Sequence, residues 1–336
     1  MSHLTISDIA RMAGVSTTAV SFVLNNKGGV SNATREKVQE IIRQTGFIPN
    51  VHTRRLNLGK SFTIHVVLRQ YSHNLFNQFA LETLSGIFAE SKSLGYSIMF
   101  TFVDDDMDCH QIIDSVRSKD CDGVILYQVA DGTLIALLQQ ENIPFVCVDA
   151  HISKDGSLPL VDVDYYDAAY QATKLLYNCG HHQIGFIGPE TPAEFYITSF
   201  DGYTAALKDF GLVCNPAWLL KISFSEQAAE YAIDQLLENG NLPTAFFCAG
   251  DSCAINMIRS AKARGLHIPD DISIMSLDDL LISRYVDPPL STMTFDKALL
   301  GQKAMRLLYR IMCEKDYAPV NLIPTSPVIR DSVKKL

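Results

Sequence analysis

The sequence predicts two fold classes in one chain: an all-α helix-turn-helix head, then an α/β core of two lobes built on doubly wound parallel sheets. Three observations support this. The chain has 336 residues, more than one ordinary domain. Residues 1–60 carry eight Lys or Arg against three acidic residues, whereas the remainder carries 20 against 34. After Lys60, helical apolar spacing gives way to short strands alternating with helices.

Three short helices are expected in the head. Thr5 with Asp8 has the spacing of a capping box, and Gly14 breaks the first helix. Ser16 caps the second helix, and Ser31 caps a third that ends at Gly46. Helical spacing turns one apolar face of each helix inward, at Ile6, Ile9, Ala10, Ala13, Val20, Val23, Leu24, Val38, Ile41 and Ile42.

The second helix is the candidate recognition helix. Thr17, Thr18, Ser21 and Phe22 are one-turn neighbours on its outer face. Two helices joined by a glycine turn and braced by a third form the DNA-binding helix-turn-helix, whose second helix enters the major groove. The alternative is an ordinary three-helix bundle. The basic charge of the head and the polar outer face favour DNA.

Repeated strand–helix units follow in the core. The first series of strands is expected at 64–68, 97–103, 123–127 and 145–148, with helices at 76–94, 110–118 and 132–140. The second series is expected at 160–163, 184–187, 219–222, 245–248 and 273–276, with helices at 166–178, 200–210, 226–238 and 251–264. Two such series predict two similar lobes with a cleft between them.

Several function classes find no support in the sequence. No GxGxxG follows a strand and no serine-hydrolase elbow or metal motif appears, so we expect no cofactor and no metal. The eight cysteines form no CxxC pair, which indicates free thiols in a reducing cytoplasm. Cys179, His181 and His182 could form a zinc site or belong to an ordinary turn. No export signal or apolar run of 18 residues is present, so no membrane partner is expected.

The head resembles the DNA-binding domain of the lactose-repressor (LacI/GalR) family. The motif residues that carry the resemblance run from Thr5-Ile6-Ser7-Asp8-Ile9-Ala10 through Ala13-Gly14-Val15-Ser16, Val20-Ser21 and Val23-Leu24-Asn25 to Val30-Ser31, Thr34-Arg35-Glu36-Lys37-Val38 and Gly46-Phe47-Ile48-Pro49-Asn50. In that family a hinge helix forms on operator DNA, and its leucine wedges into the minor groove. Leu56 occupies that position, and an isolated helix this short is unstable in water without DNA.

The resemblance implies a set of DNA-binding residues in the head and hinge. They are Thr5, Ser16, Thr17, Thr18, Ser21, Phe22, Asn25, Ser31, Asn50, Thr53, Arg54 and Leu56. Three positions depart from the family pattern: Ala19 replaces threonine, Phe22 replaces arginine and Thr53 replaces alanine. Phenylalanine can pack on a thymine methyl but cannot contact guanine with two hydrogen bonds, so Phe22 is expected to shift half-site preference.

The core resembles the periplasmic-binding-protein type I core of the same family. The matching residues are Gly180-His181, Ile184-Gly185-Phe186-Ile187-Gly188-Pro189, Gly202-Tyr203, Asp251, Ala254, Asp278-Asp279 and Pro288-Pro289-Leu290-Ser291-Thr292. The implied organisation is a DNA-binding domain at 1–48, a hinge helix and linker at 49–60, and an effector-binding and dimerisation core at 61–336. The first lobe would span about 61–160 and 290–320, and the second about 161–289 and 321–336. The crossings between lobes would lie near 158–162, 287–291 and 319–323.

The resemblance also implies effector contacts between the lobes, where ligands of open α/β sheets bind. The candidates are Arg69, Asn74, Phe76, Asp149, Ser199, Phe224, Asp251 and Asp278. Ser199 stands where many relatives have an arginine, and Arg69 stands where the family commonly has a small residue or proline. Arg69 could bind an anionic effector or pair with Asp149 or Asp278.

These features predict a cytoplasmic, nucleoid-associated transcriptional regulator, a repressor that binds a pseudo-palindromic operator as a homodimer. A small-molecule effector, a sugar or a sugar acid or phosphate, would control it. One alternative is a regulator whose core responds to a partner protein. A remote alternative is a sugar-converting enzyme with a DNA-binding head, for which Asp104, Asp105 and Asp106 would supply carboxylates. They lie in a strand-end loop with no basic partner nearby, so we expect no enzyme.

Overall fold

The computed structural model describes residues 4–24, 27–47, 59–69, 78–104, 109–150, 156–189, 194–222, 226–313 and 318–336. The chain divides into two compact units, Met1–Phe62 and Thr63–Leu336. We call them the head and the core.

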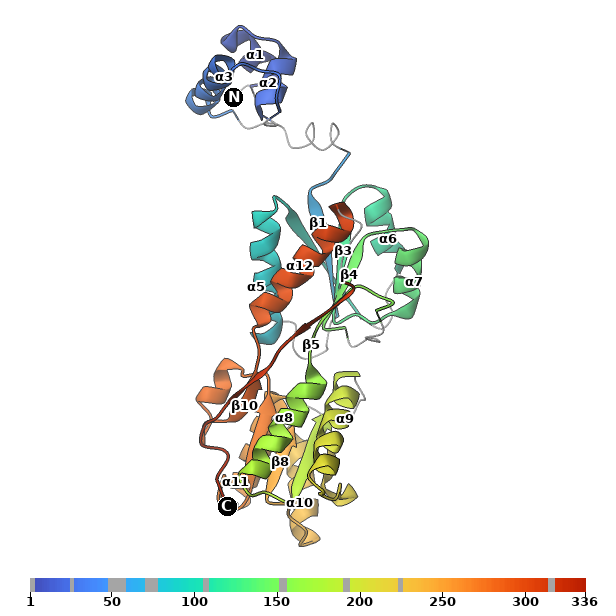
Figure 1. Ribbon diagram of the computed structural model, residues 1–336, viewed down its shortest axis with the longest axis vertical. Coiled ribbons are helices and arrows are strands. Elements are labelled where there is room, and N and C mark those ends of the chain that lie inside the picture. Colours follow the sequence, from blue (N-terminus) through green and yellow to red (C-terminus); the bar gives the residue numbers. More distant parts are fainter. Residues whose placement is uncertain are drawn as a thin grey trace. The chain divides into compact units, whose positions relative to one another are not determined.

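The head contains the three expected helices, α1 (Ile6–Ala13), α2 (Thr17–Leu24) and α3 (Asn32–Thr45) (Figure 1). The capping box of Thr5 and Asp8 is formed, and Gly14 ends α1 with φ of 64°. Ser31 caps α3 by accepting the N–H of Thr34 at 3.2 Å. The expected apolar faces meet in one small core around the fully buried Ile9, Ala13, Val20 and Val38, and Phe47 closes it.

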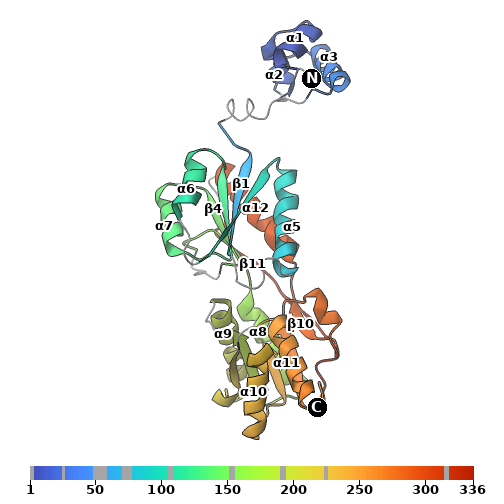
Figure 2. The same cartoon turned by 180° about the vertical axis from the view of Figure 1, so that it is seen from behind.

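The first lobe is built on a six-stranded parallel sheet with the order β11-β5-β4-β3-β1-β2. Its strands are β1 (Thr63–Arg69), β2 (Ser97–Val103), β3 (Gly123–Tyr127), β4 (Phe145–Val148), β5 (Leu160–Val163) and β11 (Val320–Ile323). Its helices are α5 (Gln78–Ser93), α6 (Cys109–Arg117), α7 (Gly132–Gln140) and α12 (Lys297–Cys313). Figures 1 and 2 show α6 and α7 on one face and α5 and α12 on the other.

Helices α5 and α12 pack with their backbones in close approach. A β-carbon on Gly86 would lie 2.0 Å from the carbonyl oxygen of Ala298, and one on Gly301 would lie 2.0 Å from that of Thr83. Only glycine fits at these two crossing points. This contact joins α12, which comes after most strands of the second lobe in sequence, firmly to the first lobe.

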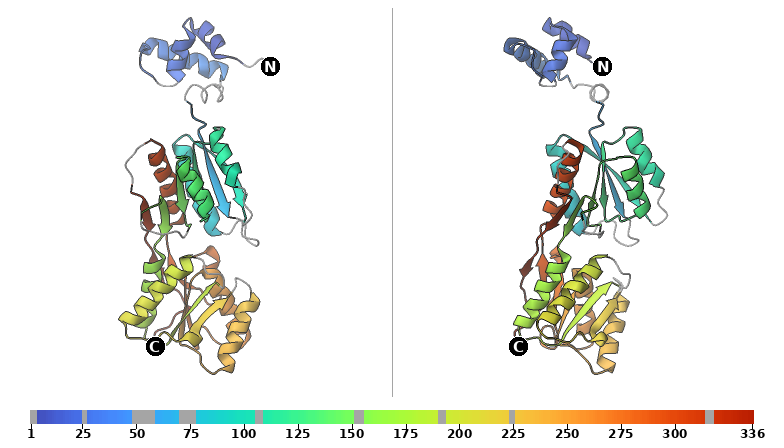
Figure 3. Two further views of the ribbon diagram at one scale, coloured as in Figure 1. Left: turned by 90° about the vertical axis from the view of Figure 1, so that its right-hand side faces the viewer. Right: turned by 45° about the vertical axis from the view of Figure 1, so that its right-hand side comes forward.

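The second lobe has the sheet order β12-β10-β9-β8-β6-β7, parallel except for β12 against β10. Its strands are β6 (Ile184–Pro189), β7 (Leu219–Ile222), β8 (Ala245–Cys248), β9 (Ser273–Leu277), β10 (Ser291–Thr294) and β12 (Ser326–Val328). Its helices are α8 (Tyr165–Asn178), α9 (Glu194–Asp209), α10 (Glu226–Glu238) and α11 (Asp251–Ala263), with short 3₁₀ turns η1 (Pro216–Trp218) and η2 (Leu281–Arg284). Figure 3 shows helices on both faces of this sheet.

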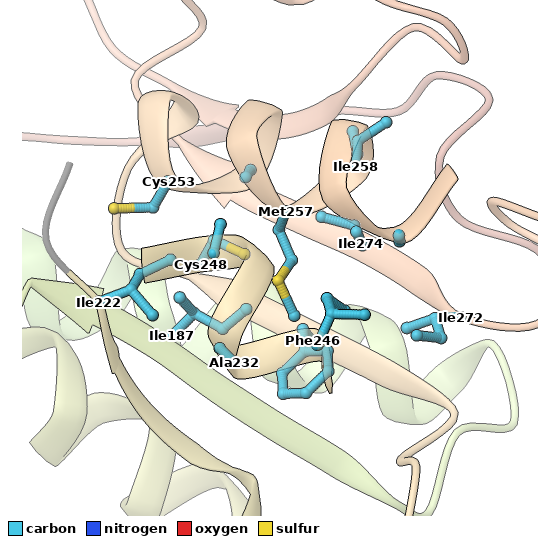
Figure 4. Packing of buried hydrophobic residues seen from close by; sticks show 14 of the residues in the cluster. Ile187, Ile222, Ala232, Phe246, Cys248, Cys253, Met257, Ile258, Ile272 and Ile274 are labelled. Atoms are coloured by element: carbon cyan, nitrogen blue, oxygen red, sulfur yellow. The ribbon is translucent and has the colours of Figure 1, made fainter. Parts of the chain in front are cut away.

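The core of the second lobe contains a layer between the sheet and helices α10 and α11. Figure 4 shows Ile187, Phe246 and Cys248 of the strands against Ala232 of α10 and Met257 of α11. Phe246 is fully buried, and its ring fills the space where a β-carbon of Gly185 would stand. Tight interdigitation of this kind holds each helix at a fixed place on the sheet.

The structure corrects the expected lobe boundaries. The strand at 160–163 was expected in the second series, but β5 pairs with β4 and β11 in the first sheet. Likewise β10 pairs with β9 in the second sheet, although the first lobe was expected to resume at 290. The chain therefore crosses between the lobes after Val163 and after Thr294, both later than expected. The third crossing follows Ile323, at the end of the expected range. An apolar strand pattern does not reveal which of two similar sheets a strand joins.

Two further differences concern helices. Helix α9 begins at Glu194, six residues before the expected start, and α12 was not anticipated at all. Within the described part of the chain, no helix is both long and apolar enough to span a membrane.

Candidate DNA-binding face and effector site

The outer face of α2 carries four of the expected DNA contacts. Thr17 and Thr18 are exposed, whereas Ser21 and Phe22 are half-buried. Ser16 starts the helix by accepting the N–H of Ala19 at 3.1 Å. The two threonines therefore present hydroxyl and methyl groups from the first turn of α2, the part of a recognition helix that contacts base edges.

Two expected DNA contacts also serve as helix caps. The Thr5 hydroxyl lies 2.7 Å from Oδ2 of Asp8, and the Thr5 N–H donates to the same oxygen at 2.9 Å. These bonds lower the pKa of Asp8. The Ser31 hydroxyl lies 2.9 Å from that of Thr34. Both residues remain exposed, so capping leaves them accessible to a phosphate oxygen.

The turn between α2 and α3 packs against Phe22. A β-carbon on Gly29 would lie 3.3 Å from Cε2 of the Phe22 ring, and Gly29 has φ of 93°. The Arg35 guanidinium donates to the carbonyl of Lys27 at 2.6 Å. Five expected DNA-binding residues, Asn25, Asn50, Thr53, Arg54 and Leu56, lie outside the described residues.

In the core, four expected effector residues end or follow strands. Arg69 is the last residue of β1, Asp149 follows β4, Asp251 begins the helix after β8, and Asp278 follows β9. Gln128, Asp149 and Asp278 have positive φ values of 55°, 47° and 119°. Non-glycine residues rarely adopt this conformation, and such strain concentrates at functional sites.

Asp149 joins the two lobes. Its carboxylate accepts a 2.7 Å hydrogen bond from Tyr165, the first residue of α8, and a 2.6 Å bond from the amide of Gln128. Asp149 is 1% exposed. Its role in this structure is therefore to hold the lobes together at the first crossing, a function that sequence reasoning missed.

Asp251, an expected effector contact, is buried among donors of the protein itself. Its side chain is 0% exposed. It accepts hydrogen bonds from the hydroxyls of Ser276, Ser283 and Thr292 and from the backbone N–H of Leu280. The four donors occupy both carboxylate oxygens, so these hydrogen bonds connect β9, β10 and η2 to the start of α11. A strand-end position cannot distinguish this role from ligand contact.

Asp278 is the expected carboxylate that remains partly accessible. Burial and the nearby Asp251 raise its pKa, while Lys297 and the N–H of Asp251 act in the opposite direction. Lys297, at the start of α12 in the first lobe, donates to the backbone carbonyl of Asp278 and lies over the Phe295 ring at 4.8 Å from its centroid. Lys297 is 3% exposed and was not anticipated. The buried Lys297 side chain thus connects the start of α12, just after the second chain crossing, to the backbone at Asp278, where β9 ends.

The remaining effector candidates are less fully described. Arg69 is half-buried. Ser199 is 1% exposed in α9, and its hydroxyl has no hydrogen-bond partner among the described residues. Asn74, Phe76 and Phe224 lie outside the described residues. A pocket of about 390 Å³ lies elsewhere on the second lobe, between α8 and the segment 325–327, and its lining contains none of the expected effector residues.

His181 belongs to a turn with structural contacts. Its Nδ1 lies 3.0 Å from the hydroxyl of Thr244, and its Nε2 lies 3.1 Å from the carbonyl oxygen of Lys334. Burial lowers its pKa. In the described parts of the chain, no group of three or more His, Cys, Asp or Glu side chains is arranged to hold a metal ion.

Comparison with known proteins identifies both units. Residues 5–50 match the model for bacterial regulatory proteins of the lacI family, and residues 173–333 match a periplasmic binding protein-like domain. The chain is 30% identical over 340 residues to the HTH-type transcriptional repressor PurR of Haemophilus influenzae (strain PittEE), covering 99% of each. It is 32% identical over 313 residues to the repressor CytR of Escherichia coli (strain K12), covering 90% of this chain and 88% of CytR.

The chain belongs to the lacI family. It is a DNA-binding transcriptional regulator, as the head predicted. Its relatives PurR and CytR are named as repressors. The head and core resemblances inferred from sequence are both confirmed.

Solved structures of lacI-family proteins share this fold. The lac repressor dimer bound to operator and the anti-inducer ONPF has a TM-score of 0.83 at 24% identity, covering 99% of this chain and 100% of that one. A LacI regulator from Bacillus cereus subsp. cytotoxis NVH 391-98 has a TM-score of 0.75 at 25% identity, covering 82% and 99%. A LacI-family regulator from Enterococcus faecium, solved with bound ribose, has a TM-score of 0.69 at 24% identity, covering 82% and 99%.

Proposed function

We propose that this lacI-family chain is a repressor that binds a pseudo-palindromic operator as a homodimer and responds to a small polyhydroxylated effector between its two lobes. The head, residues 1–48, would read the half-sites, and the hinge, residues 49–60, would place Leu56 in the minor groove. The chain would act at the nucleoid in the cytoplasm and catalyse no reaction.

The observation that carries the effector proposal is the strained, partly accessible Asp278 at the carboxyl edge of the second sheet. Its φ of 119° is unfavourable for any residue with a side chain. A carboxylate held there by α11 and Lys297 can accept hydrogen bonds from sugar hydroxyls. The bound ribose in the Enterococcus faecium regulator supports a sugar as the ligand class.

The homodimer proposal rests on exposed apolar side chains from both lobes. Phe88 on α5 is 59% exposed and Tyr285 after η2 is 75% exposed. Further exposed apolar side chains are those of Leu81, Phe100, Phe102, Leu281 and Ile282. A contiguous patch of such side chains would mark an interaction surface. A two-fold dimer through them would present two heads to a palindrome.

A contact between the lobes joins η2 to the start of α5. The N–H of Leu281 in η2 donates to Oε1 of Gln78 at the start of α5, at 2.5 Å. A change in lobe–lobe angle would alter this contact and the relative positions of the exposed apolar residues on η2 and α5. We infer that effector binding is transmitted to the heads by this route, because an effector acts only through its different affinity for two states.

A second candidate function is favoured by one observation: Asp149 and Asp251 bind protein donors instead of facing open space. Fewer free polar groups would remain for a small ligand, which suits a core that responds to a partner protein. Under this alternative the lobes would change angle when a protein binds their outer surface.

Calorimetry of the full chain against neutral sugars, sugar phosphates and uronates distinguishes the two. The effector proposal expects saturable binding by one class, lost in Asp278→Asn and kept in Asp201→Asn, an exposed acid on α9. The same ligand should change operator affinity in a titration. No binding by any class, with operator affinity unchanged, would favour the partner-protein alternative.

A further inference from the structure

We propose that Phe22 controls DNA affinity by positioning the turn between α2 and α3, and that it does not read a base. Phe22 lies on the recognition helix, where the sequence led us to expect a contact with a thymine methyl. The structure gives its ring a partner inside the protein instead. It is a positioning residue.

The partner of the ring is the backbone of Gly29. A β-carbon there would lie 3.3 Å from Cε2 and 3.5 Å from Cδ2 of Phe22. With φ of 93°, Gly29 has a conformation that other residues adopt only under strain. The ring and the glycine therefore fit each other. On the same outer face Thr17 and Thr18 are exposed, whereas Ser21 and Phe22 are half-buried.

Two hydrogen bonds hold the same turn. The N–H of Lys27 donates to the carbonyl of Phe22 at 2.8 Å, and the Arg35 guanidinium donates to the carbonyl of Lys27 at 2.6 Å. With the ring on Gly29, the turn is fixed to α2 at one end and to α3 at the other. Lys27, Gly28, Gly29 and Ser31 all remain exposed along it.

An exposed turn with a lysine, two glycines and a capping serine offers groups that bind phosphate oxygens. Phosphate contacts set the register of a recognition helix on the duplex but carry no sequence information. Loss of the Phe22 ring should therefore weaken binding to all operators by a similar factor and reduce its salt dependence. Loss of a base contact would instead change the preference at one base pair.

The test uses the full-length protein with Phe22→Ala, Phe22→Leu and the control Met12→Ala, which removes an exposed apolar side chain of the head. Binding sites are selected from random DNA, and the affinity for the selected operator is measured over a range of salt concentrations. Hydrogen exchange of the free protein reports on residues 27–31. Circular dichroism verifies that each head is folded.

Phe22→Ala should select the same sequence motif as the wild type and bind every half-site about tenfold more weakly. The slope of log affinity against log salt concentration should fall in magnitude by about one per head. Exchange at 27–31 should accelerate, and Met12→Ala should match the wild type. If Phe22→Ala unfolds the head, Phe22→Leu carries the test, with smaller changes in the same directions. A motif altered at one base pair with other preferences and the salt slope unchanged would overturn the proposal, as would unchanged exchange in the turn.

Discussion

The phenol of Tyr165 donates a 2.7 Å hydrogen bond to the carboxylate of Asp149 and thereby ties the first helix of the second lobe to a strand end of the first. Burial and the neighbouring Asp149 raise the pKa of Tyr165, so the phenol stays protonated and remains a donor. Gln128 also donates a hydrogen bond to this carboxylate. The lobes are thus joined by side chains as well as by the three chain crossings.

Tyr165→Phe should destabilise the core by about 1–3 kcal/mol, because it removes a donor from a buried carboxylate. Urea unfolding of the full chain measures the change. Tyr166→Phe is the matched control, since Tyr166 is adjacent in sequence and 45% exposed. Equal unfolding midpoints for the two variants would contradict a stabilising role for the Tyr165 phenol.

Asp251→Ala should cost at least about 3 kcal/mol of unfolding free energy, because three hydroxyls and one backbone N–H lose their common acceptor in a dry interior. The control Asp201→Ala removes an exposed carboxylate and should change stability little. Denaturant unfolding of both variants tests this. A stable Asp251→Ala core would show that water or another acceptor satisfies the four donors.

His65 should make the core sensitive to mild acid. Its ring nitrogens lie 3.0 Å from the Ser115 hydroxyl and 2.8 Å from the Thr101 hydroxyl, and burial lowers its pKa to about 4. In the unfolded chain this histidine has its ordinary pKa of 6.5 and binds a proton below that pH, whereas the folded chain does not until about pH 4. The free energy of unfolding therefore decreases as the pH falls from 6.5 to 4. The contribution is at most about 3 kcal/mol across this window.

In the variant His65→Gln the free energy of unfolding should depend less on pH between pH 6.5 and 4. The number of protons taken up on unfolding should decrease by up to one. His267→Gln is the control, because His267 is exposed beside Asp271. Urea unfolding at a series of pH values measures both. Parallel curves for His65→Gln and the wild type would mean that His65 does not titrate differently on unfolding.

Leu56→Ala should weaken operator binding strongly while the core stays folded and dimeric. An apolar wedge that separates a base step contributes a few kcal/mol only when its side chain fills the gap. Operator titration and sedimentation measure affinity and dimerisation. Leu237→Ala, on the surface of α10, is the control. Unchanged affinity for Leu56→Ala would remove the wedge from the proposed mechanism.

Arg69→Ala should abolish the response to an anionic effector without changing operator affinity in the absence of effector. A guanidinium binds a carboxylate or phosphate through two parallel hydrogen bonds. Arg69→Lys keeps the charge but not this geometry, so it should retain only part of the response. Calorimetry with uronates and sugar phosphates is the measurement. A neutral sugar that binds the wild type and Arg69→Ala equally well would exclude the anionic-effector interpretation.

Local sequence patterns predicted much of the secondary structure correctly. The caps at Thr5 and Ser31 and the breaks at Gly14 and Gly46 depend on residues within a few positions of one another, so local sequence reveals them. Helix α12 was missed although its buried residues Leu300, Ala304 and Leu307 recur at helical spacing. The sheet membership of β5 and β10 was assigned wrongly because it depends on strands that are distant in sequence.

By itself, the sequence determined the helix-turn-helix head, the alternating strands and helices of the core, and the lacI family, since these depend on short-range periodicity and motifs. Only the tertiary structure decided which carboxylates are free. Asp149, Asp251 and Asp278 all stand near strand ends, but Tyr165, Thr292 and Lys297 reach them from elsewhere in the chain. Whether a carboxylate has a structural role or remains accessible to a ligand depends on the hydrogen-bond donors that folding brings to it. Those donors are distant in sequence.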